Sequence, residues 1–171
     1  ERVPADAGAA WRYSVVFSNE DGGTPTRALF ARWGRTTDIE QVYEVRTSGG
    51  RVVGEVFQGP DHVTRAFGGR RHGDAPVLLV ATLNNMVIDR GRSLAALRLV
   101  PSLADLSAAT RESTMDARPW VYRRMAQELG AEGRIAEDAP LDERWPRVAP
   151  DPRAHLYLEA RLRLDRAVAV A

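Results

Sequence analysis

A pair of β-rich runs separated by glycines constrains the fold of this chain more than any other feature. The runs are IEQVYEVRT and RVVGEVFQ, and Ser48, Gly49 and Gly50 lie between them. Glycine adopts the positive φ angles of a tight turn at little steric cost, so this stretch predicts a β-hairpin. The chain is therefore expected to contain antiparallel β-structure.

Four further runs are predicted to be strands. WRYSVVFS (residues 11–18) alternates apolar and polar side chains. RALFARW (27–33) is short and apolar between a proline and a glycine, which favours a strand over one helical turn. PVLLVATL (76–83) is apolar on both faces, which places it in the middle of the fold. LAALRLVPS (94–102) adds another strand.

The clearest amphipathic pattern lies near the C-terminus. In HLYLEARLRLD (155–165) the leucines alternate with polar and charged residues. The leucine face must meet the core, so we expect this strand to pair with an early strand and close a single domain.

One helix is predicted near residues 119–129. Val121, Met125 and Leu129 recur at the helical spacing, Pro119 suits the first turn and Gly130 suits the C-terminal cap. With one helix and many short strands, the chain is predicted to be mainly β. The expected architecture is an antiparallel β-sandwich or a jelly-roll-like fold, because βαβ units need a helix after most strands.

Length and composition fit a single domain. The 171 residues include 44% hydrophobic residues, which suits one sizeable core. We assign residues 11–171 to this β-rich domain. The small-residue stretch at 1–10 is expected to be a linker or a processed N-terminal segment. A secreted or periplasmic location is therefore expected, with the cytoplasm as the alternative location. The oligomeric state is left open.

Composition also excludes several functions. A net charge of +1 provides no field that favours nucleic acid, and no apolar run approaches the roughly 20 residues that cross a bilayer. The absence of cysteine excludes disulfides, thiolate metal sites and cysteine nucleophiles. All 24 basic residues are arginine, which excludes Schiff-base lysines.

The loop SNEDGGT is a candidate metal site. Asn19, Glu20 and Asp21 supply the hard oxygen ligands that Ca²⁺ takes, and the two following glycines allow a sharp turn around an ion. A plain turn, in which Asn and Asp bond their own backbone, is the alternative. Calcium is the only cofactor that the sequence predicts.

Two carboxylates in WGRTTDIE are candidate catalytic groups. Asp38 and Glu40 are two residues apart, so on a strand they share a face and can divide acid and base roles. His62 is the third candidate catalytic residue, and the neighbouring Asp61 could orient it. The alternative is that these carboxylates take part in structural ion pairs.

Candidate ligand-binding residues lie close to the same strand ends. Trp33 and Arg35 precede the carboxylates, and an indole beside polar groups is typical of sugar sites, although a core position is the alternative for Trp33. Asn84 and Asn85 follow a predicted buried strand, where they either brace a loop or face a ligand.

Three functions follow from these residues. The first is a module that binds a small polar ligand or glycan, with a carbohydrate as the expected ligand and a structural calcium ion. The second is a hydrolase or lyase that uses Asp38 and Glu40, assisted by His62. The third is a secreted structural or self-assembling subunit. Nucleic acid is not an expected partner, because the arginines are interleaved with acidic residues.

Overall fold

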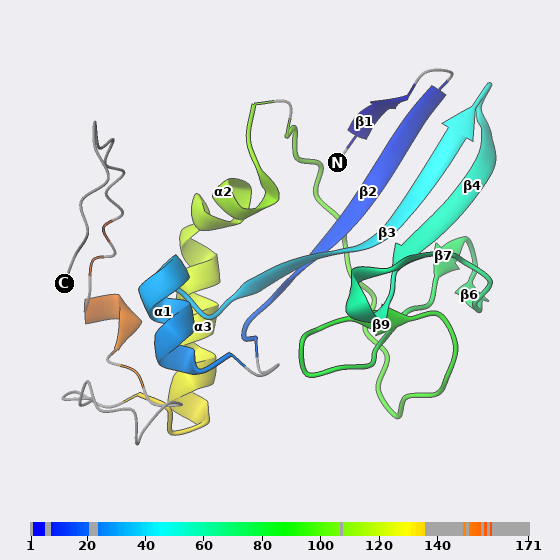
Figure 1. Ribbon diagram of the computed structural model, residues 1–171. Coiled ribbons are helices and arrows are strands. Elements are labelled where there is room, and N and C mark those ends of the chain that lie inside the picture. The colour runs from blue at the N-terminus through cyan, green and yellow to red at the C-terminus, as the bar shows by residue number, and fades with distance from the viewer. Residues whose placement is uncertain are drawn as a thin grey trace, which may run out of the picture.

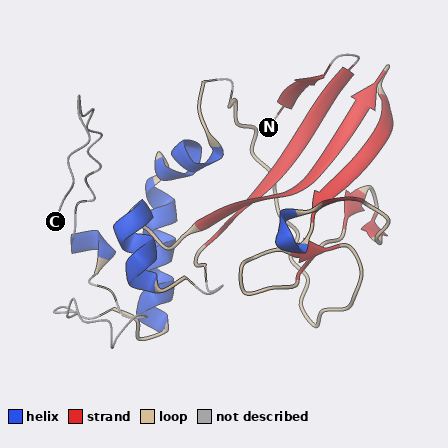
Figure 2. Cartoon of the chain, in the orientation of Figure 1, coloured by secondary structure: helices blue, strands red, loops and turns tan. Residues whose placement is uncertain are grey.

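An antiparallel sheet and a group of helices lie side by side in the computed structural model (Figures 1 and 2). The structure describes residues 2–5, 8–20, 24–106, 108–135, 149, 151–154, 156 and 158. The main sheet has five strands in the order of the chain: β1 (Arg2–Ala5), β2 (Gly8–Phe17), β3 (Asp38–Ser48), β4 (Arg51–Gln58) and β5 (Thr64–Ala66).

Short pairs and helices complete the described part. Strand β6 (Arg71–His72) pairs with β7 (Ala75–Pro76), and β8 (Leu79–Val80) pairs with β9 (Val87–Ile88). The helices are α1 (Thr26–Trp33), α2 (Arg111–Asp116) and α3 (Pro119–Ala131), with 3₁₀ turns η1 (Pro60–His62) and η2 (Pro152–Ala154).

The predicted mainly β, antiparallel character is confirmed, and so is the hairpin. Strands β3 and β4 pair across a turn in which Gly49 and Gly50 have φ angles of 55° and 75°. The described sheets are small and do not close on one another, so a sandwich or jelly roll stays a prediction. Within the N-terminal segment 1–10, β1 pairs with residues 8–11 of β2.

The prediction of a strand at residues 27–33 is wrong, because this run forms helix α1. Pro25 is the N-cap, and Gly34 ends the helix with a φ of 68° while its N–H donates to Phe30 O at 2.8 Å. The proline and glycine that resembled strand boundaries are helix boundaries. Leu29 lies in the core on one face of the helix, as an amphipathic helix requires.

Two other strand predictions also need correction. Of the run 76–83, expected in the middle of the fold, Leu79–Val80 forms β8 in a two-stranded pair, and Val80 is exposed. Residues 94–102 form no strand, and their large apolar side chains are exposed. The predicted strand at 155–165 lies outside the described residues apart from Leu156 and Leu158, which are exposed.

Helix α3 confirms the predicted helix near 119–129. Pro119 begins it, and Val121, Met125 and Leu129 are fully buried along one face. The cap prediction was wrong: Gly130 lies inside the helix, which continues to Ala131. The single-helix prediction was also wrong, because α1 and α2 accompany α3. A capping box between Thr110 and a serine in the first turn begins α2.

The apolar core has one part in the sheet and one under the helices. In the sheet, the buried cluster consists of Val42, Tyr43, Phe57 and Val87. Beside α1 and α3, the N–H of Thr36 donates to the sulfur of Met125 at 3.0 Å, which ties the approach to β3 to the helix.

Candidate functional site

A polar pocket of about 220 Å³ lies at the start of β3. Its walls come from the loop after β2, the end of α1, the first residues of β3, the end of β4, η1 and the first turn of α2. The lining residues are Glu20, Trp33, Arg35, Asp38, Ile39, Glu40, Gln58, His62, Arg111 and Glu112. The pocket therefore brings together segments from residue 20 to residue 112.

Strand β3 places two carboxylates in this pocket. Asp38 pairs with Phe17 of β2 and Glu40 with Val15, so both stand on the regular first part of the strand. A bulge follows, where the register between β2 and β3 shifts after Tyr13. Bulges bend a strand and re-aim its side chains, and this one separates the carboxylate end of β3 from its apolar middle.

The carboxyl group of Glu40 binds its proton more tightly than an ordinary glutamate does. Burial raises the pKa of its half-buried carboxyl to about 7, and the negative charge of Asp38 adds to this effect. The charges of His62 and Arg111 oppose it without cancelling it. Burial also raises the pKa of Glu20, again with a contribution from Asp38. Glu40 can therefore both release and accept a proton near neutral pH.

Asp38 is held in place by Asn85. The amide Nδ2 of this buried asparagine donates to Asp38 Oδ2 at 3.0 Å and to the carbonyl oxygen of Asn19 at 3.1 Å. Asn85 has a φ of 56°, a left-handed conformation that costs energy for a residue other than glycine. Of the two roles considered for Asn85, bracing is the one that these contacts support. Asn84 is half-buried and does not line the pocket.

Arg35 has a mainly structural environment at the edge of the pocket. Its Nε donates to Asp116 Oδ1 at 2.6 Å, and its Nη1 donates to Thr37 O at 2.5 Å. The side chain is buried although it still lines the pocket. Arg35 thus joins the approach to β3 to the end of α2.

His62 faces the carboxylates from η1. Its Nδ1 lies 2.8 Å from Gln58 Nε2, so Gln58, and not the adjacent Asp61, orients the ring. When the Gln58 amide donates this bond, Nδ1 is the acceptor and the ring proton sits on Nε2. Both Asp61 and His62 have positive φ angles, 61° and 57°. Strained backbone of this kind is concentrated at functional sites.

Trp33 lies at the rim of the pocket and is 43% exposed, so it is not a core residue. The guanidinium of Arg32 lies 4.8 Å from the ring centroid, and that of Arg35 lies 5.8 Å from it. These cation–π contacts cover part of the ring, and its exposed part stays accessible to a ligand.

The candidate calcium loop is only partly within the described residues. Asn19 is buried, Glu20 lines the polar pocket, and Asp21 lies outside the described residues. Among residues that the structure describes, no group of three or more histidine or acidic residues is arranged to hold a metal ion. Calcium therefore stays a prediction.

The pocket collects most of the residues that the sequence pointed to. It contains all three predicted catalytic residues, two of the four predicted ligand-binding residues and one of the three predicted metal ligands. Sequence reasoning missed Gln58, Arg111 and Glu112. These three come from the end of a strand and the start of a short helix, and no local pattern distinguishes them from surface residues.

No protein-family model matches the chain, and neither does any curated protein or solved structure with which it was compared. Among the described helices, none has the length and apolar character needed to span a bilayer. The function has to be argued from the geometry of the pocket.

Proposed function

We propose that the protein is an enzyme that performs acid–base chemistry on a polar ligand in this pocket, as a carboxylate-dependent hydrolase or lyase. The observation that carries the proposal is the convergence of Asp38, Glu40 and His62 in one cavity, with burial raising the pKa of Glu40 to about 7. A carboxyl group with this pKa is near half-protonated at neutral pH, which suits a general acid or base.

The environments of the two carboxylates divide their roles. Asp38 accepts a hydrogen bond from the Asn85 amide, which fixes the orientation of its carboxylate. Glu40 is the proton-transfer group, acting as an acid toward a leaving oxygen or as a base toward water or a carbon acid. His62, oriented by Gln58, provides a second donor or acceptor in the same pocket.

Carbohydrates are the substrate class that we propose. A mixed lining of carboxylates, amide, guanidinium and indole offers partners for hydroxyl groups and for one apolar ring face. Paired carboxylates are also the usual catalytic groups of glycoside hydrolysis.

The test is turnover of a panel of starch, xylan, mannan, pectin and alginate. Hydrolysis releases reducing ends, whereas elimination also produces an ultraviolet-absorbing unsaturated sugar. Glu40→Gln and Asp38→Asn should each lower the rate by about 10²-fold or more, because each removes a proton-transfer or charge-stabilising group. The rate of the wild-type protein should change across pH 7, where Glu40 titrates.

Glu132→Gln is the matched control. Glu132 is an exposed carboxylate at the end of α3 that pairs with Arg134 and does not line the pocket. The control should retain the wild-type rate. If Glu40→Gln and Asp38→Asn unfold the protein, or if both keep full activity, the carboxylates are structural and the proposal is wrong.

A second candidate is a binding module that holds a glycan without turnover, with Trp33 at the rim as the observation that favours it. Calorimetric titration of the same glycans, with and without Ca²⁺, separates the candidates, because a module binds without producing reducing ends. The closed sandwich, the structural calcium and export from the cell remain proposals that accompany this candidate.

A further inference from the structure

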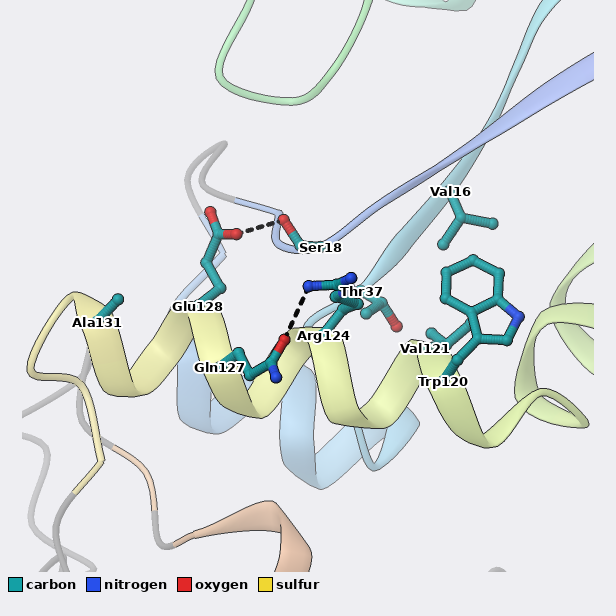
Figure 3. A pocket seen from close by; sticks show the side chains of 9 residues that line it. All are labelled: Val16, Ser18, Thr37, Trp120, Val121, Arg124, Gln127, Glu128 and Ala131. Carbon is teal, nitrogen blue, oxygen red and sulfur yellow. Dashed lines mark hydrogen bonds between the residues drawn. The ribbon is translucent and has the colours of Figure 1, made fainter. Parts of the chain in front are cut away.

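A second cavity, which we call the helix cavity, lies between α3 and the ends of β2 and β3 (Figure 3). Its volume is about 420 Å³, within the range of small-molecule sites. The lining residues are Val16, Ser18, Thr37, Trp120, Val121, Arg124, Gln127, Glu128 and Ala131. None of these residues was singled out in the sequence as a candidate for chemistry or binding, and none lines the polar pocket.

Thr37 is the residue that points to a ligand. It is only 2% exposed, and its Oγ1 has no hydrogen-bond partner among the described residues. A buried hydroxyl without a partner is costly, and native proteins contain few such groups. In Figure 3 the Thr37 side chain overlaps that of Arg124, and both residues line the cavity. The hydroxyl oxygen itself is buried, so a ligand hydroxyl in the cavity becomes its partner when the Thr37 side chain rotates toward the cavity.

The remaining polar groups are held in mutual pairs at the cavity wall. Ser18 Oγ donates to Glu128 Oε2 at 2.6 Å, and Arg124 Nη1 donates to Gln127 Oε1 at 3.0 Å (Figure 3). Both charged residues keep further capacity, since a carboxylate has a second oxygen and a guanidinium has five N–H donors. The lining thus combines donors and acceptors, and its one positive and one negative charge balance.

Trp120 supplies an apolar surface beside these groups. Its indole is 45% exposed in the first turn of α3 and stands near Val16 in Figure 3. Unlike Trp33, it has no guanidinium over its ring among the described residues. An indole face of this kind packs against the C–H face of a sugar ring.

We propose that the helix cavity is a binding site for an uncharged pyranose sugar. The balanced charge of the lining favours neither an anion nor a cation. Sugar hydroxyls both donate and accept, which fits Thr37, Gln127 and the Arg124 and Glu128 side chains, while the ring stacks on Trp120. The site is separate from the polar pocket, and the proposal does not depend on catalysis there.

The test is a titration of the ¹⁵N-labelled protein with methyl glucoside, galactoside, mannoside and xyloside, with binding located by amide shifts along α3. At least one neutral glycoside should shift the amides of residues 120–131. Thr37→Val should weaken this binding about fivefold through the lost hydrogen bond, and Trp120→Leu should weaken it about tenfold.

Thr36→Val is the matched control. Thr36 is 1% exposed and its Oγ1 also lacks a partner among the described residues, yet it does not line the cavity. It should keep wild-type affinity, and so should Glu40→Gln in the polar pocket. Both threonine variants replace a hydroxyl by a methyl group of similar size, so both should fold.

Three results would overturn the proposal. The first is that no neutral glycoside shifts the α3 amides at millimolar concentration. The second is that Thr36→Val weakens binding as much as Thr37→Val. The third is that glucuronate or free phenylalanine binds the cavity while the neutral glycosides do not. None of these results bears on turnover in the polar pocket, which is measured separately.

Discussion

The polar pocket and the helix cavity share one short segment but differ in chemistry. Arg35 and Asp38 line the polar pocket, whereas Thr37, between them, lines the helix cavity. Thr37 and Asp38 are adjacent, and successive side chains of an extended chain point in opposite directions, so the start of β3 can serve two cavities. The polar pocket concentrates interacting carboxylates, and the helix cavity balances its charges.

The polar pocket and the helix cavity are also stabilised by different interactions. Hydrogen bonds and an ion pair hold Asp38, Arg35 and His62 in the polar pocket, and the raised pKa of Glu40 makes stability there depend on pH. The helix cavity rests on the buried face of α3, whose packing is apolar and insensitive to pH. The change in unfolding free energy caused by a mutation should therefore depend on pH in the polar pocket but not beside the helix cavity.

The largest effect on stability is expected from Leu129→Ala in α3. Leu129 is fully buried, and the substitution leaves a cavity that costs about 3 kcal/mol of unfolding free energy. The loss should be the same at pH 5 and pH 8 in urea denaturation. Leu94→Ala, at a fully exposed leucine, is the control and should change stability by less than about 0.5 kcal/mol. If the loss of unfolding free energy in Leu129→Ala differed between pH 5 and pH 8, this difference between the polar pocket and the helix cavity would be contradicted.

A smaller effect is expected from Asn85→Ala. This change removes the donor to Asp38 and to the Asn19 carbonyl and places alanine at a φ of 56°, for a combined loss of roughly 2 kcal/mol. Asn85→Gly removes the same amide but accepts the backbone conformation, so it should be about 1 kcal/mol more stable than Asn85→Ala. Equal stabilities in thermal unfolding would show that the left-handed backbone carries no cost.

The smallest stability effect has the opposite sign and depends on pH. Because the pKa of Glu40 is about 7 in the folded protein and 4.5 ordinarily, the folded state binds this proton more tightly than the unfolded state. Stability from this group is complete below pH 4.5 and is lost as pH rises through 7. Glu40→Gln should therefore stabilise the protein at pH 8 by roughly 1–2 kcal/mol, reduced for partial solvent exposure.

At pH 5 the gain in melting temperature from Glu40→Gln should be much smaller than at pH 8, since Glu40 is then almost fully protonated in the folded protein. Thermal unfolding at pH 5 and pH 8 checks this difference. A gain of equal size at both pH values would mean that shape or packing, and not the carboxylate charge, sets the effect.

Local patterns predicted the elements whose stabilising contacts are close in sequence. The Ser48–Gly50 hairpin and the face formed by Val121, Met125 and Leu129 are of this kind, because turn glycines and a helical period act over a few residues. The segment 27–33 was mistaken because proline and glycine bound helices as well as strands. Burial of Leu29 against neighbouring segments selects the helix.

The sequence by itself determined the antiparallel β character, helix α3 and the identity of the candidate chemical groups Asp38, Glu40 and His62. Only the tertiary structure decided that these groups meet, that Asn85 and Gln58 orient them, and that Arg111 joins them from α2. The same is true of the helix cavity, where Thr37 and Trp120 are 83 residues apart in the chain yet line one space. Such contacts depend on long-range packing, which no local sequence period encodes.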